Sequence, residues 1–252
     1  MVEELQKTRY NYMNKKIPII GIPGSKVGDD YFGGTLAYLK YMSFFGIPRI
    51  ITLEEEVDDR IDLLIIPGGA DVDPQRYNQK PGYYTSRPDP MKEWFDTQVL
   101  PQYIKLGIPV FGICRGIQTI AVLFGAQLVQ HMYHHTNEKN RGDTVHSLEL
   151  LQTSFKDEYE ATYGKKKIQV NSLHHQCVSS ENFPAELEIL GIYPSKDSAS
   201  IEVIRHRKLP IYAVQYHPEE LTTDALGDFI VNKLLKWREL QEEIKFAKVA
   251  YD

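Results

Sequence analysis

The sequence predicts an α/β fold of three layers, in which a mostly parallel central sheet lies between helices. Two observations support this prediction. Short apolar runs alternate with segments of helical periodicity through the first half of the chain, which is typical of strand–helix–strand units. The strands expected there are apolar throughout, as in a sheet that is covered on both faces. Strand-like runs dominate the second half, and we expect them to add antiparallel strands to the same domain.

The elements of the first half follow from apolar patterns that end at turn residues. Expected strands cover residues 17–23, 48–53, 61–67 and 108–113, and expected helices cover residues 33–45, 94–106 and 116–124. Gly46, the pair Gly68-Gly69 and Gly107 follow three of these elements directly. Glycine commonly ends a helix or a strand, so these positions fix the expected boundaries.

The second half has a different pattern. Expected strands cover residues 145–151, 168–170, 187–193, 201–205 and 211–215, and an amphipathic helix is expected at residues 221–249. Residues 78–90 contain four proline or glycine residues and two tyrosines, which predicts a surface loop. This loop is either a lid over a site or only a connection.

The composition suits a single domain at residues 17–252 that follows a polar extension at residues 1–16. The chain has 252 residues, 42% of them hydrophobic, and a net charge of -5 without a basic block, so we expect no nucleic-acid partner. No apolar run reaches the roughly 18 residues of a membrane helix. The polar N-terminus lacks the apolar centre of a secretory signal, so a cytoplasmic location is expected. The sequence leaves open whether the chain forms a homo-oligomer.

A Gly-x-Cys-x-Gly sequence, Gly112-Ile113-Cys114-Arg115-Gly116, lies where an expected strand meets an expected helix. A sharp turn there lifts the middle side chain above the sheet, and small flanking residues permit the strained backbone. The start of the next helix favours a thiolate and the oxyanion that follows its attack. Cys114 is therefore a candidate nucleophile. The alternative is a buried cysteine beside two glycines that serve only packing.

A second candidate group lies at the end of the strand expected at residues 211–215, in the sequence Tyr216-His217-Pro218-Glu219. Residues two apart on an extended segment point the same way, and Pro218 favours extended backbone at His217. His217 can then face the thiol while Glu219 reaches its other ring nitrogen, as in an activated cysteine nucleophile. The alternative is a histidine at a strand end beside a nearby acid.

Several motifs together resemble the class I glutamine amidotransferase superfamily. They include Gly112-Ile113-Cys114-Arg115-Gly116-Ile117-Gln118 and, later in the chain, Val214-Gln215-Tyr216-His217-Pro218-Glu219. Three further segments are similar to its γ-glutamyl hydrolase branch, specifically the γ-glutamyl-γ-aminobutyrate hydrolase type of the peptidase C26 family. They are residues 67–74 (Pro-Gly-Gly-Ala-Asp-Val-Asp-Pro), residues 170–176 (Val-Asn-Ser-Leu-His-His-Gln) and Gln-Leu-Val-Gln at 127–130. The resemblance covers roughly residues 17–235.

The resemblance implies a flavodoxin-like arrangement of the sheet and helices, without a cofactor or a metal. It implies that Cys114 is the nucleophile, that His217 is the general base and acid, and that Glu219 orients His217. The substrate implied is a small γ-glutamyl compound.

The resemblance also implies roles around the triad. The backbone N–H groups of Gly69 and Arg115 would form an oxyanion hole. Gln118, one helical turn beyond the nucleophile, would face the glutamyl group, and His174 or His175 would line the same pocket.

The chain departs from the family pattern at positions outside the triad. Tyr216 stands where the family usually has tryptophan, and Lys92-Glu93 stand where it often has Arg-Asp. Asp96 replaces an expected glutamate. These departures bear on the choice of leaving group rather than on the chemistry.

Two other features carry less weight. His131, His134 and His135 have a spacing that can bind a metal on a helix, but no cysteine or glutamate nearby completes a ligand set, and we expect a polar surface segment. Cys177 is expected to be a packed small hydrophobe, not a second reactive thiol.

Three functions fit the motifs. The first is a free-standing hydrolase that cleaves a γ-glutamyl amide through a thioester and releases glutamate and an amine. The second is a glutaminase subunit that supplies ammonia to a synthase. The third is a binding protein on an inactive hydrolase scaffold, against which the intact Cys, His and Glu argue. The motifs at 67–74 and 171–176, and our expectation of a single domain without a fused synthase domain, favour the first.

Overall fold

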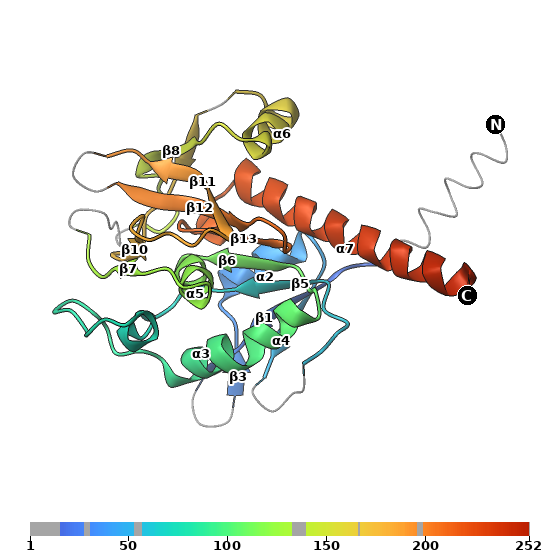
Figure 1. Ribbon diagram of the computed structural model, residues 1–252, viewed down its shortest axis with the longest axis horizontal. Helices are drawn as coiled ribbons and strands as arrows, with labels where there is room; N and C mark the ends of the chain where they lie inside the picture. Colours follow the sequence, from blue (N-terminus) through green and yellow to red (C-terminus); the bar gives the residue numbers. More distant parts are fainter. Residues whose placement is uncertain are drawn as a thin grey trace.

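The computed structural model describes residues 16–27, 31–52, 57–132, 140–165, 167–195 and 199–251. Within these ranges, nine strands form the central sheet in the order β4-β1-β5-β6-β13-β12-β11-β8-β9 (Figure 1). Five neighbouring strands pair in parallel: β4 (Ile47–Ile51), β1 (Ile19–Pro23), β5 (Leu63–Ile66), β6 (Val110–Ile113) and β13 (Ile211–Val214). The predicted parallel part of the sheet is therefore confirmed.

The remaining four strands extend the sheet in antiparallel pairs beside β13. They are β12 (Ser200–His206), β11 (Leu187–Tyr193), β8 (His146–Leu150) and β9 (Ile168–Val170). These are the antiparallel additions expected from the second half of the sequence. Two small pairs lie outside the main sheet and were not predicted: β2 (Ser25–Val27) with β3 (Tyr31–Gly33), and β7 (Leu128–Val129) with β10 (Cys177–Val178).

Helices cover both faces of the sheet and give the three layers. Successive residues of β5 point into different cores: Leu64 packs in a cluster with Tyr103 and Ile117, and Leu63 in a cluster with Met42 and Ile230. The first face carries α4 (Leu100–Lys105) and α5 (Arg115–Leu123), and the second carries α2 (Leu36–Ser43), α6 (Ser154–Tyr163) and α7 (Ala225–Tyr251).

Two helices differ from the sequence prediction. The helix expected at residues 94–106 begins earlier, as α3 (Pro90–Trp94), and continues through a π-helical turn, Phe95–Val99, into α4. Asp89 caps it by accepting hydrogen bonds from the Met91 and Lys92 N–H groups. The helix α6 was not predicted because its apolar face is narrow, with Phe155 and Tyr159 as its buried residues.

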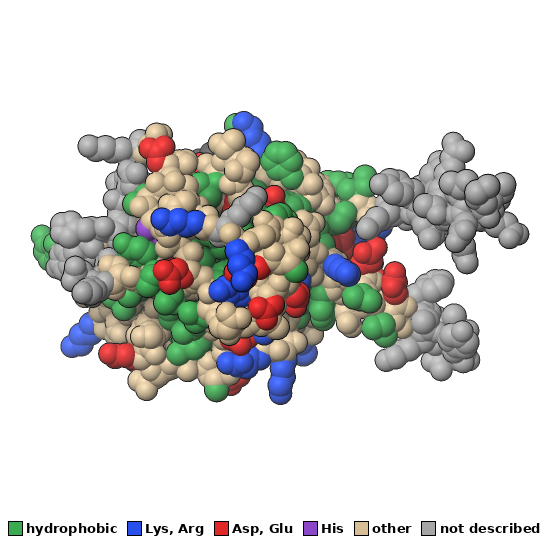
Figure 2. All heavy atoms as spheres, turned by 90° about the horizontal axis from the view of Figure 1, so that it is seen from above, with side chains coloured by type: hydrophobic (Ala, Val, Ile, Leu, Met, Phe, Trp, Pro, Cys, Tyr) green, Lys and Arg blue, Asp and Glu red, His purple; other side chains and the backbone are tan. Residues whose placement is uncertain are grey.

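The loop expected at residues 78–90 is largely confirmed, since residues 78–89 form neither helix nor strand between a 3-10 turn, Pro74–Tyr77, and α3. Helix α7 extends beyond the sheet (Figure 1). None of the helices in the described part of the chain combines the length and apolar character needed to cross a bilayer. On the face in Figure 2, acidic and basic side chains are interspersed.

Three adjacent strand ends position the site. β5, β6 and β13 are neighbours and run in the same direction, with Ile113 of β6 paired to Val214 of β13. Their carboxyl ends therefore meet at one edge of the sheet, where open α/β sheets bind their ligands. The residues that follow these ends are Gly68-Gly69, Cys114 and His217.

Candidate active site

Cys114 lies in a sharp turn between β6 and α5. Its backbone has φ 54° and ψ -108°, a conformation that residues other than glycine rarely adopt. The turn is held from below, because Cys114 N donates a hydrogen bond of 2.8 Å to Val214 O on β13. Strain of this kind costs on the order of 1–3 kcal/mol and persists where the surrounding structure enforces it, often at functional sites.

The two flanking glycines are needed for this turn. A Cβ atom on Gly116 would lie 2.2 Å from Ile66 O, and one on Gly112 would lie 2.7 Å from Gly116 O. Both glycines therefore let α5 start directly against β5 and β6. The packing of these two glycines and the sharp turn at Cys114 therefore occur together, and the one does not exclude the other.

His217 and Glu219 form a buried pair beside the cysteine. Nδ1 of His217 lies 2.6 Å from Oε1 of Glu219. Gly68 packs between the histidine and the cysteine, since a Cβ atom there would lie 2.9 Å from His217 Cε1 and 3.5 Å from Cys114 Cβ. The backbone at His217 is extended, as predicted from Pro218.

The electrostatics of His217 fit a cysteine–histidine pair. Burial lowers the pKa of the imidazole, but the neighbouring Cys114 sulfur and the hydrogen-bonded Glu219 carboxylate outweigh burial and raise the pKa to about 10. A protonated imidazole beside a thiolate is the reactive form of such a pair.

Asn171 holds the backbone of His217 at two points, a role that the sequence analysis did not assign. His217 N donates to Asn171 Oδ1 at 2.8 Å, and Asn171 Nδ2 donates to His217 O at 3.0 Å. Asn171 is fully buried. It belongs to a quoted motif, but its hydrogen bonds are to backbone atoms, which no side-chain pattern reveals.

Tyr38 on α2 is a second site residue that the sequence did not indicate. Its buried hydroxyl accepts a hydrogen bond of 2.8 Å from Gly68 N. Burial, followed by the charge of the nearby Glu219, raises the pKa of the phenol well above its ordinary value. Tyr38 thus lies between the Glu219 carboxylate and the Gly68-Gly69 segment. It lay in an expected apolar helix face without any distinguishing signal.

The expected oxyanion donors lie at the ends of neighbouring strands. Gly69 follows β5, and Arg115 is the first residue of α5, where backbone N–H groups have no partner within the helix. The Arg115 side chain points away and is buried, with Nη1 2.7 Å from Asp96 and Nη2 2.6 Å from Glu93. Arg115 can therefore offer the site only its backbone, as the resemblance implies.

The three expected substrate-binding side chains lie close together, yet each already has protein partners. Gln118 is buried and donates to Gln176 O at 3.0 Å, and His174 Nδ1 lies 2.9 Å from the same oxygen. His175 is more exposed, and its Nε2 lies 3.2 Å from Asp71 Oδ1. Their roles in binding substrate stay predictions.

The side-chain amide of Gln130 holds the loop at residues 78–89 in place. Gln130 Oε1 accepts hydrogen bonds from Gly82 N at 2.7 Å and Thr85 Oγ1 at 2.6 Å. Gln130 Nε2 donates to Gln79 Oε1 at 2.7 Å and Lys80 O at 2.9 Å. All the hydrogen-bonding capacity of this side chain is thus directed at the loop.

Asp71 and His131 fasten the loop further. Ser86 N donates to Asp71 Oδ2 at 2.8 Å, and the Tyr84 ring stacks on His131 with 4.0 Å between centroids. Burial raises the pKa of Asp71, but His175 and Ser86 outweigh it, so that the pKa is lowered overall. The side chains of Asp71 and His175 join this loop to the segment that carries His174.

The histidine cluster at residues 131–135 is only partly within the described residues, whereas Cys177 is described. His134 and His135 lie outside the described residues, while His131 Nδ1 is 3.2 Å from His175 Nδ1. Within the described ranges, no group of three or more His, Cys, Asp or Glu side chains suits a metal ion. Burial raises the pKa of the Cys177 thiol to about 12, as suits an unreactive packed cysteine.

Comparison with known proteins identifies the family. The sequence model of the family described as Peptidase C26 matches residues 18–219. The chain belongs to the peptidase C26 family. Protein NtpR of Enterococcus hirae is 26% identical to it over 245 residues, which cover 86% of the chain and 99% of NtpR.

Two further similar proteins are a synthase subunit and a solved structure. One subunit of the glutamine-hydrolysing GMP synthase of Pyrococcus furiosus is 29% identical over 136 residues, covering 54% of the chain and 63% of that protein, which is less than two thirds of its length. The solved structure of PurLQS from Thermotoga maritima matches with a TM-score of 0.57 and 15% identity, covering 88% of this chain and 99% of that one. This second likeness concerns the fold.

Family and relatives support one class of reaction. That class is cysteine-dependent amide hydrolysis or glutamine amidotransferase activity.

Proposed function

We propose that the protein hydrolyses a γ-glutamyl amide whose leaving group is an amine larger than ammonia, of the γ-aminobutyrate or polyamine type. The observation that carries the proposal is Cys114, held in a strained turn beside the hydrogen-bonded pair of His217 and Glu219. The resemblance to the γ-glutamyl-γ-aminobutyrate hydrolase type supports the choice of substrate.

The first half of the reaction forms a thioester. The Cys114 thiolate attacks the γ-carbonyl carbon, and the oxyanion that forms accepts hydrogen bonds from the N–H groups of Gly69 and Arg115. The imidazolium of His217 gives its proton to the amine nitrogen as the C–N bond breaks. The amine leaves, and the glutamyl group stays on sulfur.

The second half releases glutamate. His217, now neutral, takes a proton from water, and the resulting hydroxide attacks the thioester carbonyl. The C–S bond breaks and regenerates the thiolate beside the imidazolium. Glu219 stabilises that imidazolium and fixes the ring orientation in both halves. Gln118, His174 and His175 would contact the glutamyl group.

The GMP synthase relative favours a second candidate, a glutaminase subunit that passes ammonia to a synthase. Such a subunit often completes its site only when the partner docks, whereas a free-standing hydrolase needs no partner. The loop at residues 78–89, fastened by Gln130 in the isolated chain, supports the hydrolase.

A substrate panel tests the proposal. Purified protein is assayed for glutamate release from glutamine, γ-glutamyl-aminobutyrate, γ-glutamyl polyamines and polyglutamates. We expect a γ-glutamyl amine to be cleaved with a higher kcat/KM than glutamine, without any other protein. Cleavage of glutamine alone, or of nothing until a synthase is added, would favour the ammonia donor instead.

A further inference from the structure

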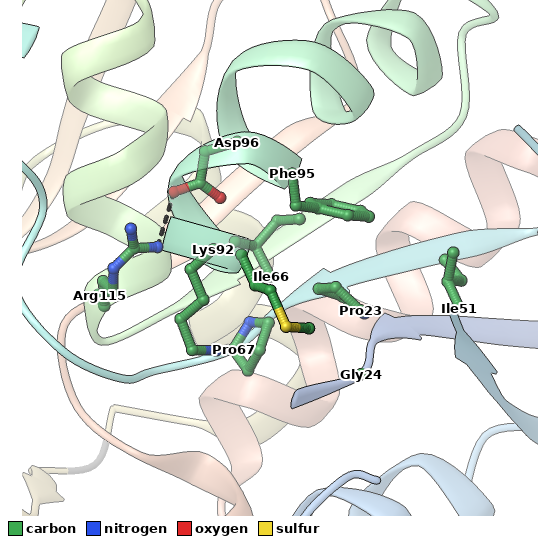
Figure 3. A pocket seen from close by; sticks show the side chains of 10 residues that line it. Pro23, Gly24, Ile51, Ile66, Pro67, Lys92, Phe95, Asp96 and Arg115 are labelled. Atoms are coloured by element: carbon green, nitrogen blue, oxygen red, sulfur yellow. Dashed lines mark hydrogen bonds and ion pairs between the residues drawn. The ribbon is translucent and has the colours of Figure 1, made fainter. Parts of the chain in front are cut away.

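Lys92 on α3 takes the space that a side chain at position 69 would fill. A Cβ atom on Gly69 would lie 2.6 Å from Lys92 Cε and 3.3 Å from Nζ. Figure 3 shows the lysine chain running away from Asp96 and Arg115 and ending beside Pro67. The end of the Lys92 side chain, with its ammonium group, therefore occupies the space beside Gly69.

This ammonium group is close to the candidate reaction centre. With ordinary bond lengths, Nζ lies within about 6 Å of the Gly69 backbone nitrogen, a proposed oxyanion donor. The preceding residue, Gly68, packs against Cys114 and His217. Gly68 therefore lies beside the candidate nucleophile, and Gly69 lies beside the lysine.

Lys92 forms no ion pair with a carboxylate in the described part of the chain, and Asp89 and Asp96 act on its charge only from a greater distance. In the part of the chain that the structure describes, no acidic side chain lies within 4 Å of its Nζ. The neighbouring acids Glu93 and Asp96 instead form ion pairs with Arg115 and Arg76. Burial, followed by the nearby Arg115 charge, lowers the pKa of Lys92, and these two causes outweigh the opposing charges of Asp89 and Asp96. An anion at this point would offset the cost of holding the cation there.

The cavity beside Lys92 is not large enough for a substrate. It is lined by Pro23, Pro67, Met91 and Lys92 among others, and its volume of about 10 Å³ admits one water molecule at most (Figure 3). The exposed Gly69, which has no side chain, leaves an approach to the ammonium open on its side.

We propose that Lys92 binds the α-carboxylate of the γ-glutamyl group, an inference that rests on the proposed function. In an extended γ-glutamyl group the α-carboxylate lies roughly 5 Å from the scissile carbonyl by ordinary bond lengths. A carbonyl at the Gly69 N–H therefore brings the carboxylate within reach of Nζ. The pair forms a charge-assisted hydrogen bond and selects glutamyl substrates over amides without this carboxylate.

A pair of substrates tests the proposal. One is the γ-glutamyl anilide, and the other is the same compound with its α-carboxylate converted to a carboxamide. Lys92→Met keeps the hydrocarbon chain against Gly69 and removes the charge. We expect it to lower kcat/KM for the carboxylate substrate by roughly 10- to 100-fold, mainly through KM, as for a lost charged hydrogen bond. Lys92→Met should cleave the carboxamide substrate at the wild-type rate. Lys92→Arg, which keeps the positive charge, should largely retain the selectivity for the carboxylate substrate. An equal loss on both substrates would mean that Lys92 only supports Gly69, and would overturn the proposal.

A measurement without substrate separates this inference from the proposed function. Iodoacetate carries a negative charge and iodoacetamide does not. A cation near Cys114 therefore raises the rate of alkylation by iodoacetate relative to the rate by iodoacetamide. Lys92→Met should lower this ratio, whereas Lys105→Met, at an exposed position on α4, should not. If no γ-glutamyl compound is cleaved, the proposed function fails and the ratio still tests Lys92. An unchanged ratio in Lys92→Met would contradict its place at the site.

Discussion

At the scale of single residues, the site depends on a cysteine whose backbone is strained and whose partners are buried. Cys114 has a positive φ, and the absence of side chains at Gly112 and Gly116 permits the close packing around this turn. His217 is in turn held by three hydrogen bonds, one from its ring to Glu219 and two between its backbone and Asn171. Such fixed geometry lets a proton move between defined atoms without prior rearrangement.

Glu219→Gln tests the role of the carboxylate. The variant keeps a hydrogen-bonding group but removes the charge that stabilises the His217 imidazolium. We expect kcat to fall by roughly 10²-fold or more, though less than in Cys114→Ala. The pKa of His217 should fall from its raised value, because Glu219 is one of the groups that raise it. The pH profile of iodoacetamide labelling at Cys114 measures this shift.

Glu220→Gln is the matched control. The neighbouring acid pairs with Arg141 at 2.7 Å, away from the His217 ring, and its loss should leave kcat and the labelling profile near wild type. If Glu219→Gln behaves like this control, the site works as a cysteine–histidine dyad and Glu219 only caps a strand end.

The sequence predicted side chains better than it predicted their supports. The geometry of His217 and Glu219 followed from a two-residue spacing and a proline, and Cys114 from a glycine-flanked turn. Tyr38 and Asn171 could not be assigned in this way, because they act through Gly68 N and the His217 backbone. Such contacts depend on which strands become neighbours, a property that single motifs do not contain.

At the scale of elements, the loop at residues 78–89 behaves as a fixed rim. Four hydrogen bonds from Gln130 and the bonds between Asp71 and Ser86 hold it, and the exposed Tyr83 and Tyr84 lie on it. The sequence could not distinguish a lid from a connection here, because the fastening side chain comes from a segment far along the chain.

Gln130→Ala should loosen this loop. Removing four hydrogen bonds, each contributing about 0.5–1.5 kcal/mol, should raise cleavage of residues 78–89 by limited proteolysis at least about tenfold. If the loop contacts the leaving amine, kcat/KM for a γ-glutamyl amine should fall more than that for glutamine. Gln98→Ala, at an exposed helix position, serves as the control. Faster proteolysis with an unchanged substrate ratio would exclude the loop from leaving-group recognition.

The early start of the helix at Pro90 had a readable signal. Asp89 followed by proline is a typical helix N-terminus, and both features are used in the structure. The helix α6 lacked such a signal in its hydrophobic pattern, since tertiary packing of two aromatic residues stabilises a largely polar segment.

At the scale of the whole molecule, the sheet order brings the site together from distant parts of the sequence. Cys114 and His217 follow adjacent strands. Tyr216, the residue before His217, connects this region to the start of helix α7 by donating a hydrogen bond of 2.9 Å to Asp224. Asp224 is partly buried directly before α7, and its Oδ2 also accepts a hydrogen bond from Gly227 N at 2.9 Å. Burial raises its pKa to about 7, despite the hydrogen bonds that lower it.

This raised pKa makes the global stability depend on pH. In the unfolded chain Asp224 titrates near pH 4, so between about pH 4 and 7 the folded state binds more protons at this group. The free energy of unfolding contributed by Asp224 is therefore fully present below pH 4 and is lost as the pH rises through 7.

Asp224→Asn removes this dependence while keeping an oxygen acceptor for Tyr216 and Gly227. From pH 5 to pH 8 the free energy of unfolding of the variant should rise relative to wild type, by on the order of a few kcal/mol. Urea denaturation at the two pH values measures it, with Asp143→Asn, at an exposed turn, as the control. A difference between variant and wild type that does not change with pH would show that Asp224 is ionised throughout.

Trapping the glutamyl-enzyme tests the central claim, a covalent intermediate on Cys114, most directly. The protein is mixed with the fastest γ-glutamyl substrate, quenched in acid within one turnover, digested and analysed by mass spectrometry. We expect one glutamyl group on the peptide that contains Cys114, none on the peptide with Cys177, and neither adduct nor turnover in Cys114→Ala. Hydrolysis by Cys114→Ala at a rate near wild type, or an adduct on Cys177 alone, would contradict the account.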